Sequence, residues 1–286
     1  MSFLSWPYVE GTSVWGENTS AYDFCEMNYY ITNYIAEFVN VSTNLGYIYL
    51  GYKGIRNNRR GNNDAVVTTC YMLLQSIGVG SGIYHAAPKY FTQMVDEFPM
   101  LYATAGILYG TLSITLGASA RKSLAILMPF FITGVSIAHA CLGNVTLFRM
   151  TFLSLILSVL GWLTYLVNFR VPDAKVRKDA ACLTGYGAGF FLLGYVLWNV
   201  DMHLCSYLTG VRQMVGMPLG FLIEFHGWWH IFTGIAVYYD IVFIEYLRLY
   251  MTSRNTKSPR NFKLIWSNRY TLPHMQIDQK PVLKKS

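Results

Sequence analysis

Seven apolar segments, each long enough to cross a lipid bilayer, constrain this sequence more than any other feature. A helix needs roughly 20 apolar residues to span the hydrocarbon core of a membrane. Only 13% of the residues are charged, whereas soluble domains carry about 25%. The sequence therefore predicts an all-α, polytopic membrane protein built as a seven-transmembrane-helix bundle. The expected spans lie near residues 33–52, 65–84, 98–117, 124–142, 146–167, 181–200 and 219–247.

The basic residues predict how this bundle is oriented. All but three of the 22 Lys and Arg lie in four stretches, which are residues 53–60, 121–122, 170–178 and 248–286. With seven spans these stretches fall on one side of the membrane, which the positive-inside rule identifies as cytosolic. The net charge of +7 then reflects the basic residues that orient the protein in the bilayer. No nucleic-acid partner is expected. The chain divides into a lumenal N-terminal arm, a membrane bundle and a basic cytosolic tail, over residues 1–32, 33–248 and 249–286.

Three histidines are expected to meet at the lumenal end of the bundle. His85 lies at the end of the second span, and His226 and His230 share one helical face at the start of the seventh. Three imidazoles with an open fourth position form a catalytic zinc arrangement. Ser81 lies four residues before His85, and Asp96 follows in the loop or at the start of the third span. The alternative is that each histidine is a hydrogen-bonded residue at the membrane interface; their convergence from two helices favours the metal.

Oxygen-bearing side chains form a second group at the same end of the chain. Asp23, Glu26 and Asn28 lie within six residues, and Glu37 follows inside the first apolar segment. A carboxylate within a span needs a partner, and calcium takes six to eight oxygen ligands. A solvated acidic surface is the alternative interpretation for the first three residues.

Two of the five cysteines are expected on the lumenal side of the membrane. Cys25 lies in the arm and Cys205 in the loop between the sixth and seventh spans. Oxidation is permitted there, so a disulfide and two free thiols both stay open. Cys70, Cys141 and Cys182 fall in spans or at their ends, where cysteine commonly serves as a small core residue.

Four motifs resemble those of a known family. The segments DFCEMNY, GVGSGIYH…QMVDEFPM, LWNVDMHLC and HGWWHIFTG occur in this order. Together they resemble the alkaline ceramidases, seven-span intramembrane amidases of the endoplasmic reticulum and Golgi. The N-terminal segment is most similar to fungal and plant members, which prefer phytoceramide or dihydroceramide. The resemblance implies hydrolysis of the ceramide amide to a sphingoid base and a fatty acid, with a ceramide-class membrane lipid as substrate.

The resemblance also implies which residues form the site. It implies zinc held by His85, His226 and His230, with Ser81 and Asp96 beside the reacting water. It implies a calcium site with five ligands, namely Asp23, the backbone carbonyl of Phe24, Glu26, Asn28 and Glu37. It implies a disulfide between Cys25 and Cys205. Phe24 stands where the family usually has Trp, which matters little if only its carbonyl binds.

Two functions of other classes are kept as alternatives. A lipid-sensing receptor of the adiponectin-receptor type would share the spans and the zinc ligands, but the charge distribution argues against its inverted topology. A cation transporter would use Glu37 and Asp96 as intramembrane sites. The sequence leaves the oligomeric state and the preferred ceramide open.

Overall fold

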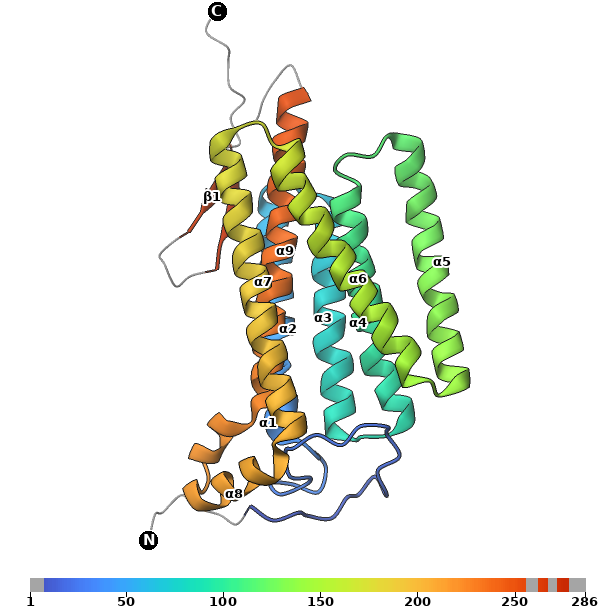
Figure 1. The fold of residues 1–286 in the computed structure, drawn as a ribbon, viewed down its shortest axis with the longest axis vertical. Coiled ribbons are helices and arrows are strands. Elements are labelled where there is room, and N and C mark those ends of the chain that lie inside the picture. The colour runs from blue at the N-terminus through green and yellow to red at the C-terminus, as the bar shows by residue number, and fades with distance from the viewer. Residues whose placement is uncertain (1–7, 256–261, 267–271, 278–286) are drawn as a thin grey trace, which may run out of the picture.

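The computed structural model describes residues 8–255, 262–266 and 272–277, which form an elongated bundle of helices (Figure 1). The long helical segments, in chain order, are α1 (Phe38–Thr43) with α2 (Leu45–Arg60), α3 (Ala65–Ala86), α4 (Tyr90–Leu112), α5 (Ala118–Leu142), α6 (Val145–Tyr165), α7 (Ala174–His203) and α9 (Phe225–Asn255). The shorter elements are the π-helical turn η1 (Leu166–Arg170), α8 (Cys205–Val215), the 3-10 turn η2 (Leu219–Ile223), and the strands β1 (Phe262–Ile265) and β2 (His274–Ile277).

The predicted seven-span helical bundle is confirmed. In the described part of the chain, α1 with α2 and six further long helices correspond to the seven apolar segments. Five of them, α3, α5, α6 with η1, α7 and α9, are long and apolar enough to cross a membrane by length and composition alone. Beyond α9, the strands β1 and β2 pair as a short antiparallel hairpin, which the apolar pattern did not predict.

Three helix boundaries differ from the expected ones. The first helix begins at Phe38, because residues 33–37 belong to the arm that binds the end of α3. Helix α4 begins at Tyr90, about two turns before the apolar segment, and the Thr92 hydroxyl accepts a hydrogen bond from the backbone of Lys89 at 2.9 Å. Such a bond satisfies an unpaired amide at a helix start. The seventh long helix begins only after η2.

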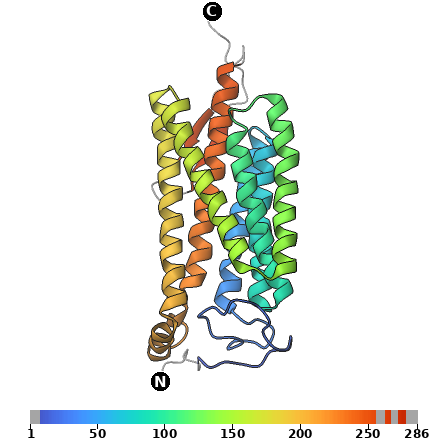
Figure 2. The same ribbon diagram turned by 45° about the vertical axis from the view of Figure 1, so that its right-hand side comes forward.

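Helix α9 is the central helix of the bundle. It packs against α7, α2, α1 and α3 (Figures 1 and 2), and its residues 241–247 are all buried. Helix α5 lies at the edge, where Phe130 and Phe131 are 78% and 61% exposed. A helix hydrogen-bonds its own backbone, so its apolar side chains can face lipid acyl chains without leaving polar groups unpaired. The edge helices therefore present the surface that a bilayer covers.

The N-terminal arm, residues 8–37, crosses the end of the bundle beneath α3 and α4 (Figure 1). The backbone amide of Glu37 donates to the carbonyl of His85, and that of Ala36 to the carbonyl of Ala86, each at 3.0 Å. The last carbonyls of a helix have no partner within it, so the arm satisfies groups that α3 leaves free. The arm is thereby fixed against the residue that ends α3.

Gly80 sets how closely α3 and α4 approach each other. A methyl group at this position would overlap the backbone oxygen of Val95 on α4. We expect Gly80→Ala to destabilise the protein by about 1–3 kcal/mol, the usual cost of overpacking, measured as a lower thermal midpoint in detergent. Gly134→Ala on α5, where nothing lies within 4 Å of the added atom, is the control and should not lower the midpoint. Equal midpoints for the two variants would contradict this interpretation.

Candidate metal centre

Three imidazoles meet at the end of the bundle that the arm covers. His85 lies in the last turn of α3, and His226 and His230 lie in the first two turns of α9. The ring centroids are 5.0 Å apart for His85 and His226, 4.9 Å for His85 and His230, and 4.6 Å for His226 and His230. One ligand nitrogen of each lies within 4.8 Å of the others, and all three side chains are buried. Among the described residues, no other group of three His, Cys, Asp or Glu side chains converges in this way.

Glu37 orients the first histidine. Nδ1 of His85 lies 2.6 Å from Oε2 of Glu37, and both side chains are at most 2% exposed. The same carboxylate oxygen accepts a hydrogen bond from the side-chain amide of Asn40 at 2.7 Å. Because a carboxylate accepts the Nδ1 proton, Nε2 of His85 keeps its lone pair for a metal, which is the usual arrangement of a metal-binding histidine.

The two histidines on α9 differ in their surroundings. Nδ1 of His230 lies 3.0 Å from the hydroxyl of Thr43, and the ring also hydrogen-bonds to the backbone of Asn40. Nδ1 of His226 is buried without a hydrogen-bond partner among the described residues. A buried polar atom without a partner costs about 1–3 kcal/mol. Three neighbouring imidazoles, one with an unpaired buried nitrogen, therefore fit a bound metal ion.

Ser81 and Asp96 lie together, one helical turn from His85. Ser81 is 3% exposed and hydrogen-bonds to the Asp96 carboxylate across the contact between α3 and α4. Asp96 lies inside α4 rather than in a loop, because that helix begins early. The structure thus places Ser81 on the same helix as His85 and Asp96 on the neighbouring helix α4.

The ring of Phe24 covers the histidines from the arm. It stacks on His226 with a centroid distance of 3.9 Å and an interplanar angle of 29°, and its centroid is 5.2 Å from that of His85. The sequence interpretation considered only the Phe24 carbonyl, and the side chain adds a packing role. The sequence did contain a sign of this packing role, because the resembling family usually has another aromatic residue, Trp, at the position of Phe24.

Among the proposed calcium ligands, the carboxylates of Asp23, Glu26 and Glu37 do not form a group within ligand distance of one another in the described structure. Glu26 is buried and accepts hydrogen bonds from the amides of Val39 at 2.6 Å and Asn40 at 2.9 Å. Burial raises the pKa of Glu26 to about 8; these amides oppose the shift, and the carboxylate of Glu37 adds to it. Asp23 is exposed. Asn28 keeps one buried side-chain oxygen without a partner among the described residues.

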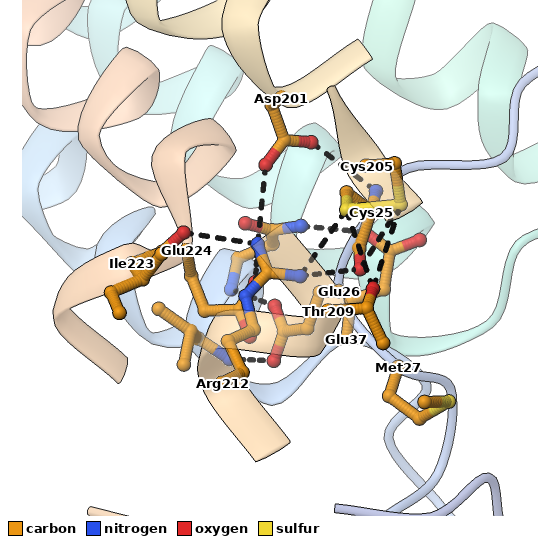
Figure 3. A network of polar contacts seen from close by, with 12 residues as sticks. Cys25, Glu26, Met27, Glu37, Asp201, Cys205, Thr209, Arg212, Ile223 and Glu224 are labelled. Carbon is orange, nitrogen blue, oxygen red and sulfur yellow. Dashed lines mark hydrogen bonds and ion pairs between the residues drawn. A yellow bond between two sulfur atoms is a disulfide. The ribbon is translucent and has the colours of Figure 1, made fainter. Parts of the chain in front are cut away.

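Cys25 and Cys205 form a disulfide in the structure, and it joins the arm to the start of α8. Beside it lies a group of buried charges that the sequence interpretation did not include, namely Arg212, Asp201 and Glu224 (Figure 3). Their spacing follows no local motif. The available signal was that Arg212 is one of only three basic residues expected outside the cytosolic stretches.

A fourth buried histidine lies away from the centre. His139 at the end of α5 hydrogen-bonds to Glu97 on α4, and Gln93 donates to the same carboxylate at 3.0 Å. Both members of the pair are at most 2% exposed. This histidine is therefore engaged in holding α5 to α4.

The fold and the site define a polytopic helical membrane protein with a buried three-histidine centre at the end of the bundle that the N-terminal arm covers. A family model described as Ceramidase matches residues 16–276. Alkaline ceramidase YPC1 of Saccharomyces cerevisiae is 33% identical over 288 residues, which cover 93% of this chain and 88% of the yeast protein. Alkaline ceramidase 3 of Mus musculus is 31% identical over 260 residues, covering 87% and 91% of the two chains. The alkaline ceramidase of Arabidopsis thaliana is 25% identical over 246 residues, covering 86% and 91%.

The chain belongs to the alkaline ceramidase family. The match extends over nearly the whole of the described chain and includes most of the arm and the three histidines. The predicted resemblance is therefore confirmed.

Replacing Glu37 is expected to weaken metal binding through His85. Loss of an outer partner of a metal ligand typically lowers metal affinity by about 10–100-fold, and we expect Glu37→Ala to fall in this range. The test is dialysis of the protein against increasing concentrations of a chelator. The metal that stays bound is measured by plasma mass spectrometry. Glu97→Gln is the matched control, because it disrupts the other buried Glu–His pair and should leave metal retention unchanged. Equal retention in both variants would show that Glu37 does not support the site.

Proposed function

We propose that the chain hydrolyses the amide bond of a ceramide at the three-histidine centre, releasing a sphingoid base and a fatty acid. As a member of the alkaline ceramidase family it is a hydrolase acting on an amide bond. The observation that supports this location for the chemistry is the convergence of His85, His226 and His230 in a buried site at one end of the bundle.

Zinc is the metal we propose for this centre. Neutral imidazole nitrogens suit zinc, and three protein ligands leave one position for water or substrate. The unpaired Nδ1 of His226 supports a bound cation, and the carboxylate on His85 supports a fixed ligand geometry. When bound, zinc would polarise the amide carbonyl and make a hydrolytic water acidic near neutral pH.

Asp96 and Ser81 are proposed to handle the proton and the oxyanion. The Asp96 carboxylate would take the proton of the attacking water and pass it to the leaving nitrogen, as general base and then general acid. The Ser81 hydroxyl hydrogen-bonds to Asp96, which orients that carboxylate for proton transfer. To donate to a developing oxyanion, the hydroxyl would have to turn from Asp96 toward the substrate. Removal of such a donor typically costs about 2.7–4 kcal/mol.

The surroundings of the site fit a substrate drawn from the bilayer. The substrate we propose is a ceramide of the phytoceramide or dihydroceramide type, with its two chains held among the helices. The charge distribution supports a lumenal arm and a cytosolic C-terminus. A location in the endoplasmic reticulum or Golgi is proposed from the family resemblance alone. Membership of a ceramidase family favours this amidase over a lipid-sensing receptor or a cation transporter.

The proposed chemistry is tested with detergent-purified protein. Fatty acid release from ceramide, dihydroceramide and phytoceramide is measured together with zinc content. We expect His230→Ala to lose both zinc and turnover, and Asp96→Asn to keep zinc while turnover falls by about 10²–10⁴-fold, the range typical of general acid–base catalysis. His139→Gln, a change to the buried histidine that pairs with Glu97, should retain zinc. Full turnover and zinc content in His230→Ala would refute the proposal.

A calcium site in the arm is a separate proposal, made from Asp23, the Phe24 carbonyl, Glu26, Asn28 and Glu37. The buried carboxylates of Glu26 and Glu37 and the unpaired oxygen of Asn28 support it. Binding would require Asp23, which is exposed, to turn inward.

Calcium is expected to raise the thermal midpoint of the wild-type protein. Asn28→Ala should reduce calcium affinity by about tenfold, equivalent to about 1.4 kcal/mol, measured as the shift in the calcium dependence of the midpoint. Asn18→Ala, at an exposed position in the same arm, is the control. A wild-type midpoint that does not respond to calcium would exclude the site.

A further inference from the structure

Arg212 on α8 is completely buried among groups from three distant parts of the chain (Figure 3). Its guanidinium lies 2.8 Å from a carboxylate oxygen of Glu224 and 3.5 Å from one of Asp201. It also donates to the carbonyl of Cys25 at 2.8 Å and to that of Ile223 at 3.0 Å. One side chain thus joins the arm, the end of α7 and the segment directly before α9.

The contacts of Asp201 connect this cation to the metal centre. Its carboxylate faces the backbone amides of Phe225 and His226, the first two residues of α9. Its Oδ2 also accepts from the amide of Cys25 at 3.2 Å. The first amides of a helix have no partner within it, and a carboxylate that faces them is electrostatically favoured. Asp201 therefore lies against the turn that carries His226.

Glu224 provides the second connection. It is the residue immediately before α9, and its side chain is 1% exposed. Its Oε1 accepts a hydrogen bond from the hydroxyl of Tyr8 at 2.7 Å, while Arg212 lies against Oε2. Residues 223 and 224 are thus both held by the guanidinium, three and two positions before His226.

Stability alone is a weak reason for such a cluster. Desolvating buried charges often costs as much as their attraction returns, so well-packed apolar residues can replace a buried ion pair without loss. What a planar guanidinium does supply is several donors in a fixed geometry. Here those donors hold both the carboxylate that faces the α9 amides and the two residues that precede α9.

We propose that Arg212 is a positioning residue for the metal centre: by holding Asp201 and Glu224, it fixes the first turn of α9 and hence His226. The proposal rests on the proposed function of the three histidines as a metal site. Arg212 contacts none of the histidines, so its effect passes through the backbone of the α9 start. It also holds the carbonyl of Cys25, the neighbour of the Phe24 that stacks on His226.

Two measurements on Arg212→Met test the proposal. The first is zinc retention against a chelator, which we expect to fall by about 10–100-fold, as for other supporting residues of metal ligands. The second is hydrogen–deuterium exchange of the 224–230 segment, measured on the full chain with zinc and after zinc removal. We expect faster exchange of the Phe225 and His226 amides in both states. Arg212→Lys, which keeps the charge but not the planar fork, should restore only part of each effect.

Arg248→Met is the matched control. Arg248 lies toward the other end of α9, where it pairs with Asp64 at 2.8 Å and donates to Ser113 at 2.7 Å. Its loss should lower the thermal midpoint without changing zinc retention or exchange at the α9 start. If Arg212→Met matches this control in both measurements, Arg212 is only a stabilising residue and the proposal is overturned.

A double variant separates positioning from charge compensation, and it serves if the single variant does not fold. Arg212→Met with Glu224→Gln removes the cation and one of its anions together, so less unpaired charge stays buried. Relative to Arg212→Met, we expect the double variant to have a partly restored thermal midpoint. Its zinc retention should stay low, and exchange of the 224–230 segment should stay fast. Recovery of all three would overturn the proposal. Because exchange is also measured without zinc, a wild-type protein that binds no zinc would refute the proposed function and leave this test intact.

Discussion

The hydrogen bond between Glu37 and Nδ1 of His85 is the interaction on which the site depends most directly. It buries a carboxylate at the end of a membrane helix, where an unpaired charge would be costly. The backbone of the same residue pairs with the carbonyl of His85, so one residue connects the arm to α3 twice. The position of the first histidine and the path of the arm are consequently not independent.

The charges near this end of the bundle follow the same constraint. Glu26 is satisfied by backbone amides at the start of α1. Asp201 accepts from the amide of Cys25 and lies near Arg212, and Glu224 is paired with Arg212 and Tyr8. Helix starts present unpaired donors, and these carboxylates are placed against them or against a buried cation. In low-dielectric surroundings such pairing fixes geometry strongly, because each alternative arrangement leaves a charge or an amide unsatisfied.

Much of the fold and the centre of the site could be predicted from the sequence. Successive spans cross the membrane in opposite directions, so the end of the second span and the start of the seventh lie on the same side. This places His85 and His226 at the same end of the bundle without any knowledge of packing. The partner of Glu37 could not be predicted, because it depends on how residues 33–37 turn back onto α3 rather than on helical periodicity. The packing of the Phe24 ring was missed for a related reason: an irregular arm has no repeating pattern from which side-chain direction follows.

Arg212 shows the same limit for buried charges. A single arginine in a polar loop has the local pattern of a surface residue, and its partners come from positions far away in the chain. Only the three-dimensional arrangement shows that a cation is completely enclosed there.

The disulfide between Cys25 and Cys205 spans 180 residues of sequence, which has a consequence for biosynthesis. The arm and His85 leave the ribosome early, whereas both histidines of α9 are made only with the last long helix. Cys25 must therefore wait as a free thiol through the insertion of most of the bundle before Cys205 exists, although the arm can already pair with the end of α3. A chain that stops before α9 retains the cysteine pair but one histidine of the three, so the centre is assembled at the end of synthesis and not helix by helix.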